Sequence, residues 1–189
     1  MSETRPGPSN AEIAPFRVVF LCTANICRSA YAGVIAAADP IPGVEFRSAG
    51  THALVGRPLD PPMLEQLPAG IDGRRQRARQ LNGRRARDSD LIVSMADVHT
   101  DYVVDEWPQL MRRTFLIGQV ARGLENAPDG TRLADLPDLL WADRSRQDGD
   151  QIDDPYGRGR AAAEAAARSI DDKVARIVAG LRRLNGGQA

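Results

Sequence analysis

The chain has 189 residues, 42% of them hydrophobic, and its 25 basic residues balance its 25 acidic ones. This length suits one domain with a single core, and a balanced charge gives no overall field toward nucleic acid or a membrane surface. No stretch approaches the roughly 20 apolar residues that a transmembrane helix needs, which excludes a membrane-spanning class.

The first residues, MSETRPGPSNAEIAP, have no positive region followed by an apolar stretch. They predict a flexible tail over residues 1–15 rather than a secretion signal, followed by a single domain over residues 16–189. Two cysteines are too few for a disulfide framework at this length. We therefore expect a cytoplasmic protein, where a reducing compartment keeps both thiols free.

The first strand is predicted over residues 16–21, where FRVVFL is an apolar run interrupted only by Arg17. Such a run suits a strand that is buried on both faces of a parallel sheet. The Ala-rich stretch SAYAGVIAAAD has the length of a helix and stops at Asp39, because the following proline disfavours helical geometry there. The order is therefore strand, loop, helix.

The same order repeats along the chain. Strands are predicted at VEFRSAG (residues 44–50), at SDLIVSM (residues 89–95) and within RRTFLIGQV, which runs on into a helix. Helices are predicted at LDPPMLEQLPAG, which starts at proline and ends at Gly70, and at ADVHTDYVVDEW. This alternation indicates an α/β fold with a parallel sheet.

Two later segments depart from the alternation. Residues 125–150 are polar and rich in Asp, although LADLPDLLWADRS has apolar spacing for a helical turn or two. This insert is either a lid or a surface elaboration without function. Apolar residues at helical spacing from Ile170 to Leu181 predict a packing helix over residues 159–184.

The most reactive side chain follows the first strand. Cys22 begins the loop between that strand and a helix, and ligands of open α/β sheets bind at the carboxyl ends of strands. Backbone N–H groups and the positive end of the helix would face an anion there and would stabilise a thiolate. Arg28 adds a planar fork of donors for two phosphate oxygens, and Ser29 can donate to the thiolate. These residues outline a covalent phosphoryl-transfer site; a buried, inert cysteine is the alternative.

Other polar residues carry smaller predictions. Asn25 tolerates the left-handed backbone region better than other non-glycine residues, so we expect it to hold an unusual backbone angle. Cys27 either forms a protective disulfide with Cys22 under oxidation or is a small buried loop residue. His52 and His99 form no recognisable metal-ligand spacing and are interpreted as structural or surface residues.

The segment VVFLCTANICRS resembles the active-site loop of the low-molecular-weight protein tyrosine phosphatases, whose pattern is Cys-x-Gly-Asn-x-Cys-Arg-Ser after a strand. FRSAGT, RARQL with DLIVSM, and DDPYG are similar to further motifs of that family, in the family's order. The resemblance implies a three-layer α/β fold, in which a four-stranded parallel sheet has helices on both faces. It also implies metal-independent hydrolysis of phosphate monoesters, without a cofactor.

The resemblance assigns Cys22 as nucleophile, Arg28 as a phosphate ligand and Asp154 as general acid. Asp154 is preferred over its neighbour Asp153 because it directly precedes proline, as in the family's motif. The implied cycle forms a cysteinyl-phosphate while Asp154 protonates the leaving oxygen, and the same Asp then activates water.

The remaining implied site residues support the loop or the substrate. Ser48 is implied to tie down Asn25 together with Ser29, and Tyr156 can stack on an aromatic leaving group. The implied phosphate-binding loop comprises Thr23, Ala24, Asn25, Ile26, Cys27 and Ser29.

The sequence departs from the family pattern at Ala30, where proline is common, and at two further positions of the site. Ala24 stands where glycine is usual, so a methyl group narrows the cradle if that position needs a positive φ or close approach to phosphate. Gln76 stands where many members have histidine, although its amide can still bond to Asn25. We expect a less active or reshaped pocket that keeps all the chemical groups.

A phosphorylated protein, with phosphotyrosine first, is the expected partner. The alternative is a small-molecule phosphate monoester in a biosynthetic pathway, with contacts supplied by the insert. Arsenate reduction with an external thiol, which needs only Cys22, and phosphate binding without turnover are further alternatives, and the presence of Asp154 argues against the last. No membrane partner is expected. Nucleic acid is not expected either, because the arginines between residues 74 and 87 are interpreted as a solvated helical face.

Overall fold

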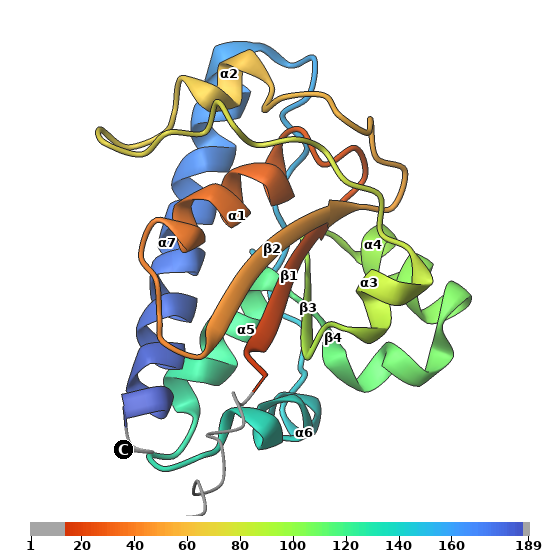
Figure 1. The fold of residues 1–189 in the computed structure, drawn as a ribbon, viewed down its shortest axis with the longest axis vertical. Helices are drawn as coiled ribbons and strands as arrows, with labels where there is room; N and C mark the ends of the chain where they lie inside the picture. The colour runs from red at the N-terminus through yellow and green to blue at the C-terminus, as the bar shows by residue number, and fades with distance from the viewer. Residues whose placement is uncertain (1–13, 187–189) are drawn as a thin grey trace, which may run out of the picture.

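The computed structural model describes residues 14–186, and its centre is a sheet of four parallel strands (Figure 1). The strands are β1 (Phe16–Cys22), β2 (Val44–Gly50), β3 (Leu91–Ser94) and β4 (Thr114–Leu116), in the spatial order β2-β1-β3-β4. Every pairing is parallel. Residues 1–13 and 187–189 lie outside the described residues, so the tail over residues 1–15 and the domain over residues 16–189 stay predictions.

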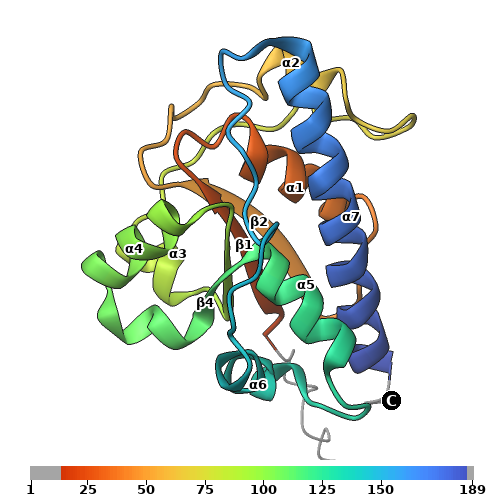
Figure 2. The ribbon, with the colours of Figure 1, turned by 180° about the vertical axis from the view of Figure 1, so that it is seen from behind.

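Helices cover both faces of the sheet, which confirms the predicted three-layer α/β fold. Helices α1 (Arg28–Ala37), α5 (Ile117–Asn126) and α7 (Gly159–Gly186) lie on one side, and α3 (Gly83–Arg87) and α4 (Asp97–Glu106) on the other (Figures 1 and 2). Alternate residues of a strand point to opposite faces. Val18 and Phe20 accordingly belong to the large core beneath α1, α5 and α7, while Val19 and Leu21 belong to a smaller core beneath α3 and α4. The apolar run of β1 is therefore buried on both faces, as predicted.

Two predictions about the segment between β2 and β3 are wrong. The helix expected over LDPPMLEQLPAG is only the single turn of α2 (Pro61–Leu64), and the chain then turns away. Pro68 explains why no helix reaches Gly70, because proline disfavours helical geometry in the preceding residue and lacks an N–H donor. The arginine run is helical only in α3, where Asn82 caps the helix by accepting from the Arg85 N–H at 3.0 Å.

The segment after β3 contains both expected and unexpected elements. A 3-10 helix, η1 (Pro108–Arg113), precedes β4, and the insert over residues 125–150 holds η2 (Leu133–Asp135) and α6 (Leu136–Ala142). These two short helices confirm the helical turns expected in LADLPDLLWADRS, and α7 confirms the closing packing helix. Within residues 14–186, no helix combines the length and the apolar character needed to cross a membrane.

Candidate active site

The loop from Cys22 to Arg28 lies at the carboxyl end of β1, as predicted from the sequence. Cys22 is the last residue of β1, and α1 begins at Arg28. Carbonyl groups of this loop are bound from outside by the segment after β2. The Thr51 N–H donates to the Cys22 carbonyl at 2.9 Å, and the His52 N–H to the Thr23 carbonyl at 3.0 Å. The Leu54 N–H donates to the Ala24 carbonyl at 3.0 Å, and the Asp60 N–H to the Ile26 carbonyl at 2.8 Å.

These contacts orient the loop for anion binding. In a trans peptide unit the C=O and N–H groups point in opposite directions, so outward carbonyls turn the amides inward. The described part of the chain offers no hydrogen-bond acceptor to the backbone N–H groups of residues 24–29. Free N–H groups at the start of a helix form a cradle that suits phosphate oxygens.

The Cys22 thiol is held inside this cradle by a short polar network. Its Sγ lies 2.9 Å from Ser29 Oγ, which accepts from Asn25 Nδ2 at 2.9 Å and can donate to the Ala49 carbonyl at 3.1 Å. A hydroxyl carries one proton, so Ser29 donates either to Ala49 or to the sulfur. A thiolate is the stronger acceptor because it is charged. The Ser29 hydroxyl can therefore donate to the sulfur when Cys22 is a thiolate.

The backbone of Asn25 confirms one prediction and removes a concern about Ala24. Asn25 has φ 55°, the single positive φ among non-glycine residues in the described part of the chain. Ala24 therefore adopts no left-handed geometry, and its methyl group adds no strain of that kind.

Of the two hydroxyls implied to tie down Asn25, Ser29 bonds to it and Ser48 does not. The Asn25 side chain has other partners: Nδ2 donates to Ser29 at 2.9 Å, and Oδ1 accepts from the Arg79 N–H at 2.8 Å. Gln76 Nε2 instead donates to Ser48 Oγ at 3.2 Å. Ser48 and Gln76 thus pair with each other beside the loop rather than with the loop itself.

Arg28 and Asp154 are brought together although they lie far apart in the sequence. Arg28 Nη2 lies 2.9 Å from Asp154 Oδ2, and Nη1 donates to the Ile152 carbonyl at 3.1 Å. The side chain of Arg28 is only 7% exposed, whereas that of Asp154 is 54% exposed. Tyr156 is also exposed, and its N–H lies 3.3 Å from Asp154 Oδ1. The predicted nucleophile, phosphate ligand and acid therefore share one site.

His99 belongs to this site, which the sequence did not indicate. Its Nε2 lies 3.0 Å from Thr23 Oγ1, and the ring is buried. Burial, and then the positive charge of Arg28, lower the pKa of His99 from 6.5 to about 4, against a smaller opposing effect of Asp154. The imidazole is therefore neutral at neutral pH. Only the tertiary contact of α4 with the loop reveals this, because no local motif links the two residues.

The lowered pKa of His99 predicts a pH-dependent stability. Between the unfolded pKa of 6.5 and the folded value of about 4, the unfolded chain binds a proton that the folded chain does not. Stability should therefore fall as the pH falls through that window, by about 2 kcal/mol from pH ~7 to pH ~4.5. We expect His99→Gln, which can still bond to Thr23, to lose this component. Urea unfolding of both proteins at the two pH values measures it, and equal pH dependence would contradict the prediction.

Cys27 is a second free thiol at the start of α1. Burial, and then the carboxylate of Asp60, raise the pKa of Cys27 well above its ordinary range. Cys27 is thus a neutral thiol at neutral pH, and its disulfide with Cys22 under oxidation stays a prediction. In residues 14–186, no group of three or more His, Cys, Asp or Glu side chains is placed to hold a metal ion.

Comparison with known proteins gives a consistent result. A model of the low molecular weight phosphotyrosine protein phosphatase family matches residues 17–129. The protein-arginine-phosphatase of Geobacillus stearothermophilus is 30% identical over 112 residues, which are 59% of this chain and 75% of that protein. The low molecular weight protein-tyrosine-phosphatase Etp of Escherichia coli K12 is 34% identical over 103 residues, which are 54% and 69% of the two chains.

Solved structures extend the likeness beyond residue 129. The YwlE arginine phosphatase from Geobacillus stearothermophilus superposes with a TM-score of 0.70 at 26% identity, covering 89% of this chain and 94% of that one. The Erwinia amylovora tyrosine phosphatase AmsI gives a TM-score of 0.66 at 25% identity, covering 89% and 95%.

Proposed function

The chain belongs to the low molecular weight phosphotyrosine protein phosphatase family, and we propose that it hydrolyses phosphate monoesters through a cysteinyl-phosphate formed on Cys22. One observation carries this proposal. The Cys22 thiol lies 2.9 Å from a hydroxyl that can stabilise its anion, under a loop whose N–H groups are turned inward. The guanidinium of Arg28 adds the positive charge that stabilises a negative phosphoryl group.

In the first step the Cys22 thiolate attacks phosphorus, and the bond from phosphorus to the leaving oxygen breaks. The loop N–H groups and the Arg28 fork bind the three equatorial oxygens and stabilise their charge in the transition state. Arg28 pairs with Asp154 at 2.9 Å, and a bound phosphate competes for that guanidinium. Released from that ion pair, Asp154 can take up a proton and deliver it to the leaving oxygen.

In the second step water attacks the phosphorus of the cysteinyl-phosphate. Asp154, now a carboxylate, takes a proton from that water, and the sulfur–phosphorus bond breaks. Ser29 donates to the departing thiolate at the 2.9 Å contact. Inorganic phosphate is released, and the thiolate is restored for the next cycle.

We propose phosphotyrosine in proteins as the substrate. Exposed apolar side chains near the loop support an aromatic leaving group, namely Leu54 and Val55 after β2 and Tyr156 after Asp154. Phosphoarginine in proteins is the second candidate, because the Geobacillus stearothermophilus relative is named an arginine phosphatase. The relatives reported above are named protein phosphatases, so a small-molecule monoester is not favoured. The expected cytoplasmic location stays a prediction.

The substrate class can be tested with matched peptides. Two peptides of one sequence, carrying either phosphotyrosine or phosphoarginine, are compared by phosphate release in the presence of a chelator. We expect kcat/KM to be higher for phosphotyrosine by roughly 10-fold or more, the discrimination that apolar contacts provide. The opposite preference would assign the chain to phosphoarginine, and release from neither peptide would overturn the choice of a protein substrate.

A further inference from the structure

The Asp154 side chain has little to hold it in place by itself. It is 54% exposed, and the described residues give it two partners, Arg28 and the Tyr156 N–H. In the proposed reaction a phosphate competes for Arg28, so that contact is weakened when the acid must act. The position of the carboxyl during catalysis therefore depends on the backbone that leads into it.

Between helix α7 and this backbone there is open space, although the Ile152 side chain is buried in the core to which α7 contributes. Residues 147–154 and α7 border a cavity of about 490 Å³, which the α7 residues Ala162, Ala166 and Ser169 line from the other side. Open space does not fix a loop, because it supplies no packing atoms. The polar contacts of the segment before Asp154 lie on the opposite side, where α5 lies.

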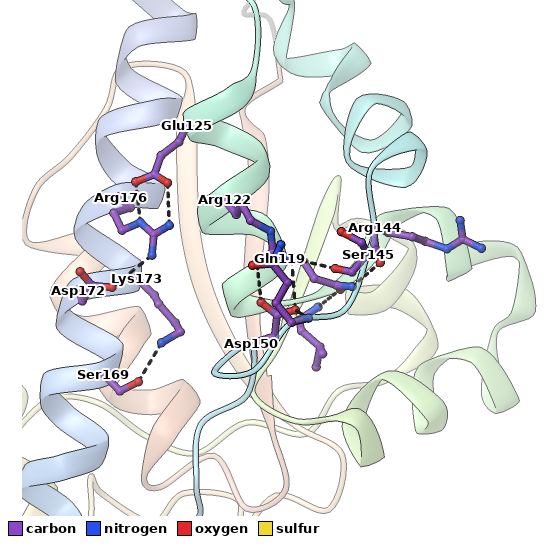
Figure 3. Close-up of polar contacts among 12 residues, drawn as sticks. Gln119, Arg122, Glu125, Arg144, Ser145, Asp150, Ser169, Asp172, Lys173 and Arg176 are labelled. Atoms are coloured by element: carbon purple, nitrogen blue, oxygen red, sulfur yellow. Dashed lines mark hydrogen bonds and ion pairs between the residues drawn. The ribbon is translucent and has the colours of Figure 1, made fainter.

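On that side a buried ion pair binds the segment before Asp154 to α5 (Figure 3). Asp150 is 3% exposed, and its Oδ1 accepts from Arg122 Nη1 at 2.7 Å. Its Oδ2 accepts from Arg122 Nη2 at 3.3 Å and from the Gln147 N–H at 2.8 Å. Arg122 Nη2 also donates to the Ser145 carbonyl at 2.8 Å. One arginine thus fixes both ends of the loop over residues 145–150.

The backbone continues this attachment toward the active site. The Gly118 N–H donates to the Asp150 carbonyl at 3.1 Å, and a Cβ at Gly118 would lie 2.5 Å from Asp150 Cα. The segment therefore lies directly on the first turn of α5. Two residues later, the Ile152 N–H donates to the Met95 carbonyl at 2.8 Å, and the Ile152 carbonyl accepts from Arg28. Asp154 is two residues further along the chain.

We propose that Arg122 and Asp150 are positioning residues that hold Asp154 at the distance its proton transfer requires. The inference rests on the proposed function, since it presumes that Asp154 is the acid. No hydrogen bond joins either side chain to the loop over residues 22–28, so they act on the site only through the segment that they hold. The last part of the insert thereby has a role other than the lid or the functionless elaboration expected from the sequence.

The test uses two aryl phosphates that differ in their need for an acid. The leaving group of p-nitrophenyl phosphate is a weak base that departs readily, whereas that of phenyl phosphate requires protonation. We expect Asp150→Asn to lower kcat/KM for phenyl phosphate by roughly 10- to 100-fold, and much less for p-nitrophenyl phosphate. Loss of folded protein would instead lower kcat/KM for both substrates by the same factor.

Two further variants keep the test decisive. Asp150→Asn leaves Arg122 charged and unpaired, so Arg122→Met/Asp150→Asn removes both charges and avoids that penalty. This double variant should show the same substrate bias. The control is Glu125→Gln, which breaks the bidentate pair of Glu125 with Arg176 at 2.6 Å, on the same helix but away from the loop (Figure 3). It should leave both values unchanged.

The outcomes separate this inference from the function on which it rests. Asp154→Asn must itself show the substrate bias, and its absence there would overturn the acid role of Asp154 and this inference with it. A bias in Asp154→Asn but in neither Asp150 variant would overturn the positioning role alone. The same bias in Glu125→Gln would show that any disturbance of α5 suffices, which also overturns it.

Discussion

Replacing Cys22 with serine should abolish turnover of aryl phosphates, a loss on the order of 10⁴-fold or more. The serine hydroxyl is almost entirely protonated at neutral pH, and no base in the described part of the chain lies within hydrogen-bond distance to activate it. Phosphate release from p-nitrophenyl phosphate at mildly acidic pH, with chelator present, measures the loss. Rapid quenching should trap cysteinyl-phosphate on the wild-type protein and none on the variant.

The controls for this substitution concern folding and the second thiol. The variant should still bind inorganic phosphate, because the loop N–H groups and Arg28 remain in place. Cys27→Ser should retain turnover and cysteinyl-phosphate formation, since burial keeps the Cys27 thiol neutral and unsuited to attack. Covalent phosphate that persists in Cys22→Ser but is lost in Cys27→Ser would overturn the assignment of the nucleophile.

Replacing Asp154 with asparagine should lower kcat/KM for phenyl phosphate by about 10²- to 10⁴-fold, the usual contribution of a general acid. Asparagine keeps the size of the side chain but has no acidic proton to transfer. The amide NH₂ also cannot form the ion pair with Arg28 that the carboxylate forms at 2.9 Å. Steady-state kinetics over a series of aryl phosphates should show the loss growing as the leaving group becomes more basic.

The matched control for Asp154 is its neighbour. Asp153 is exposed and forms no ion pair in the part of the chain that the structure describes, so Asp153→Asn should keep wild-type turnover. A loss in Asp153→Asn comparable to that in Asp154→Asn would refute the choice of the residue before Pro155. Such a result would show that the charge of the whole segment, rather than one proton donor, governs the rate.

Local patterns predicted the sheet and the centre of the site. The apolar run of β1 reflects burial on two faces, and Cys22, Asn25, Arg28 and Ser29 lie within seven residues of one another in a strand-to-helix turn. A turn of this length has few conformations, so its geometry follows largely from its own sequence. The positive φ of Asn25 is an example, because steric preference acts within a single residue.

Boundaries were harder to predict where tertiary contacts compete with local preference. The stretch after Pro61 has helix-forming residues, yet α2 stops at Leu64, before Pro68. The arginines over residues 74–79 lie on irregular backbone, and the Arg79 N–H donates to Asn25. An N–H used in this way cannot form a helical hydrogen bond. The local sequence pattern does not indicate that Asn25 is the acceptor.

The sequence by itself determined the alternating α/β order and the strand-to-helix loop that begins at Cys22. Through its likeness to a family, it also led to the proposal that Cys22 and Asp154 act at one site. Only the tertiary structure decided which side chains contact each other around the site. Gln76 bonds to Ser48, His99 to Thr23, and Arg122 pairs with Asp150. The physical reason is the range of the interactions. Helix, strand and turn preferences act over a few residues, whereas these hydrogen bonds join residues 28 to 76 positions apart, which meet only after the sheet has assembled.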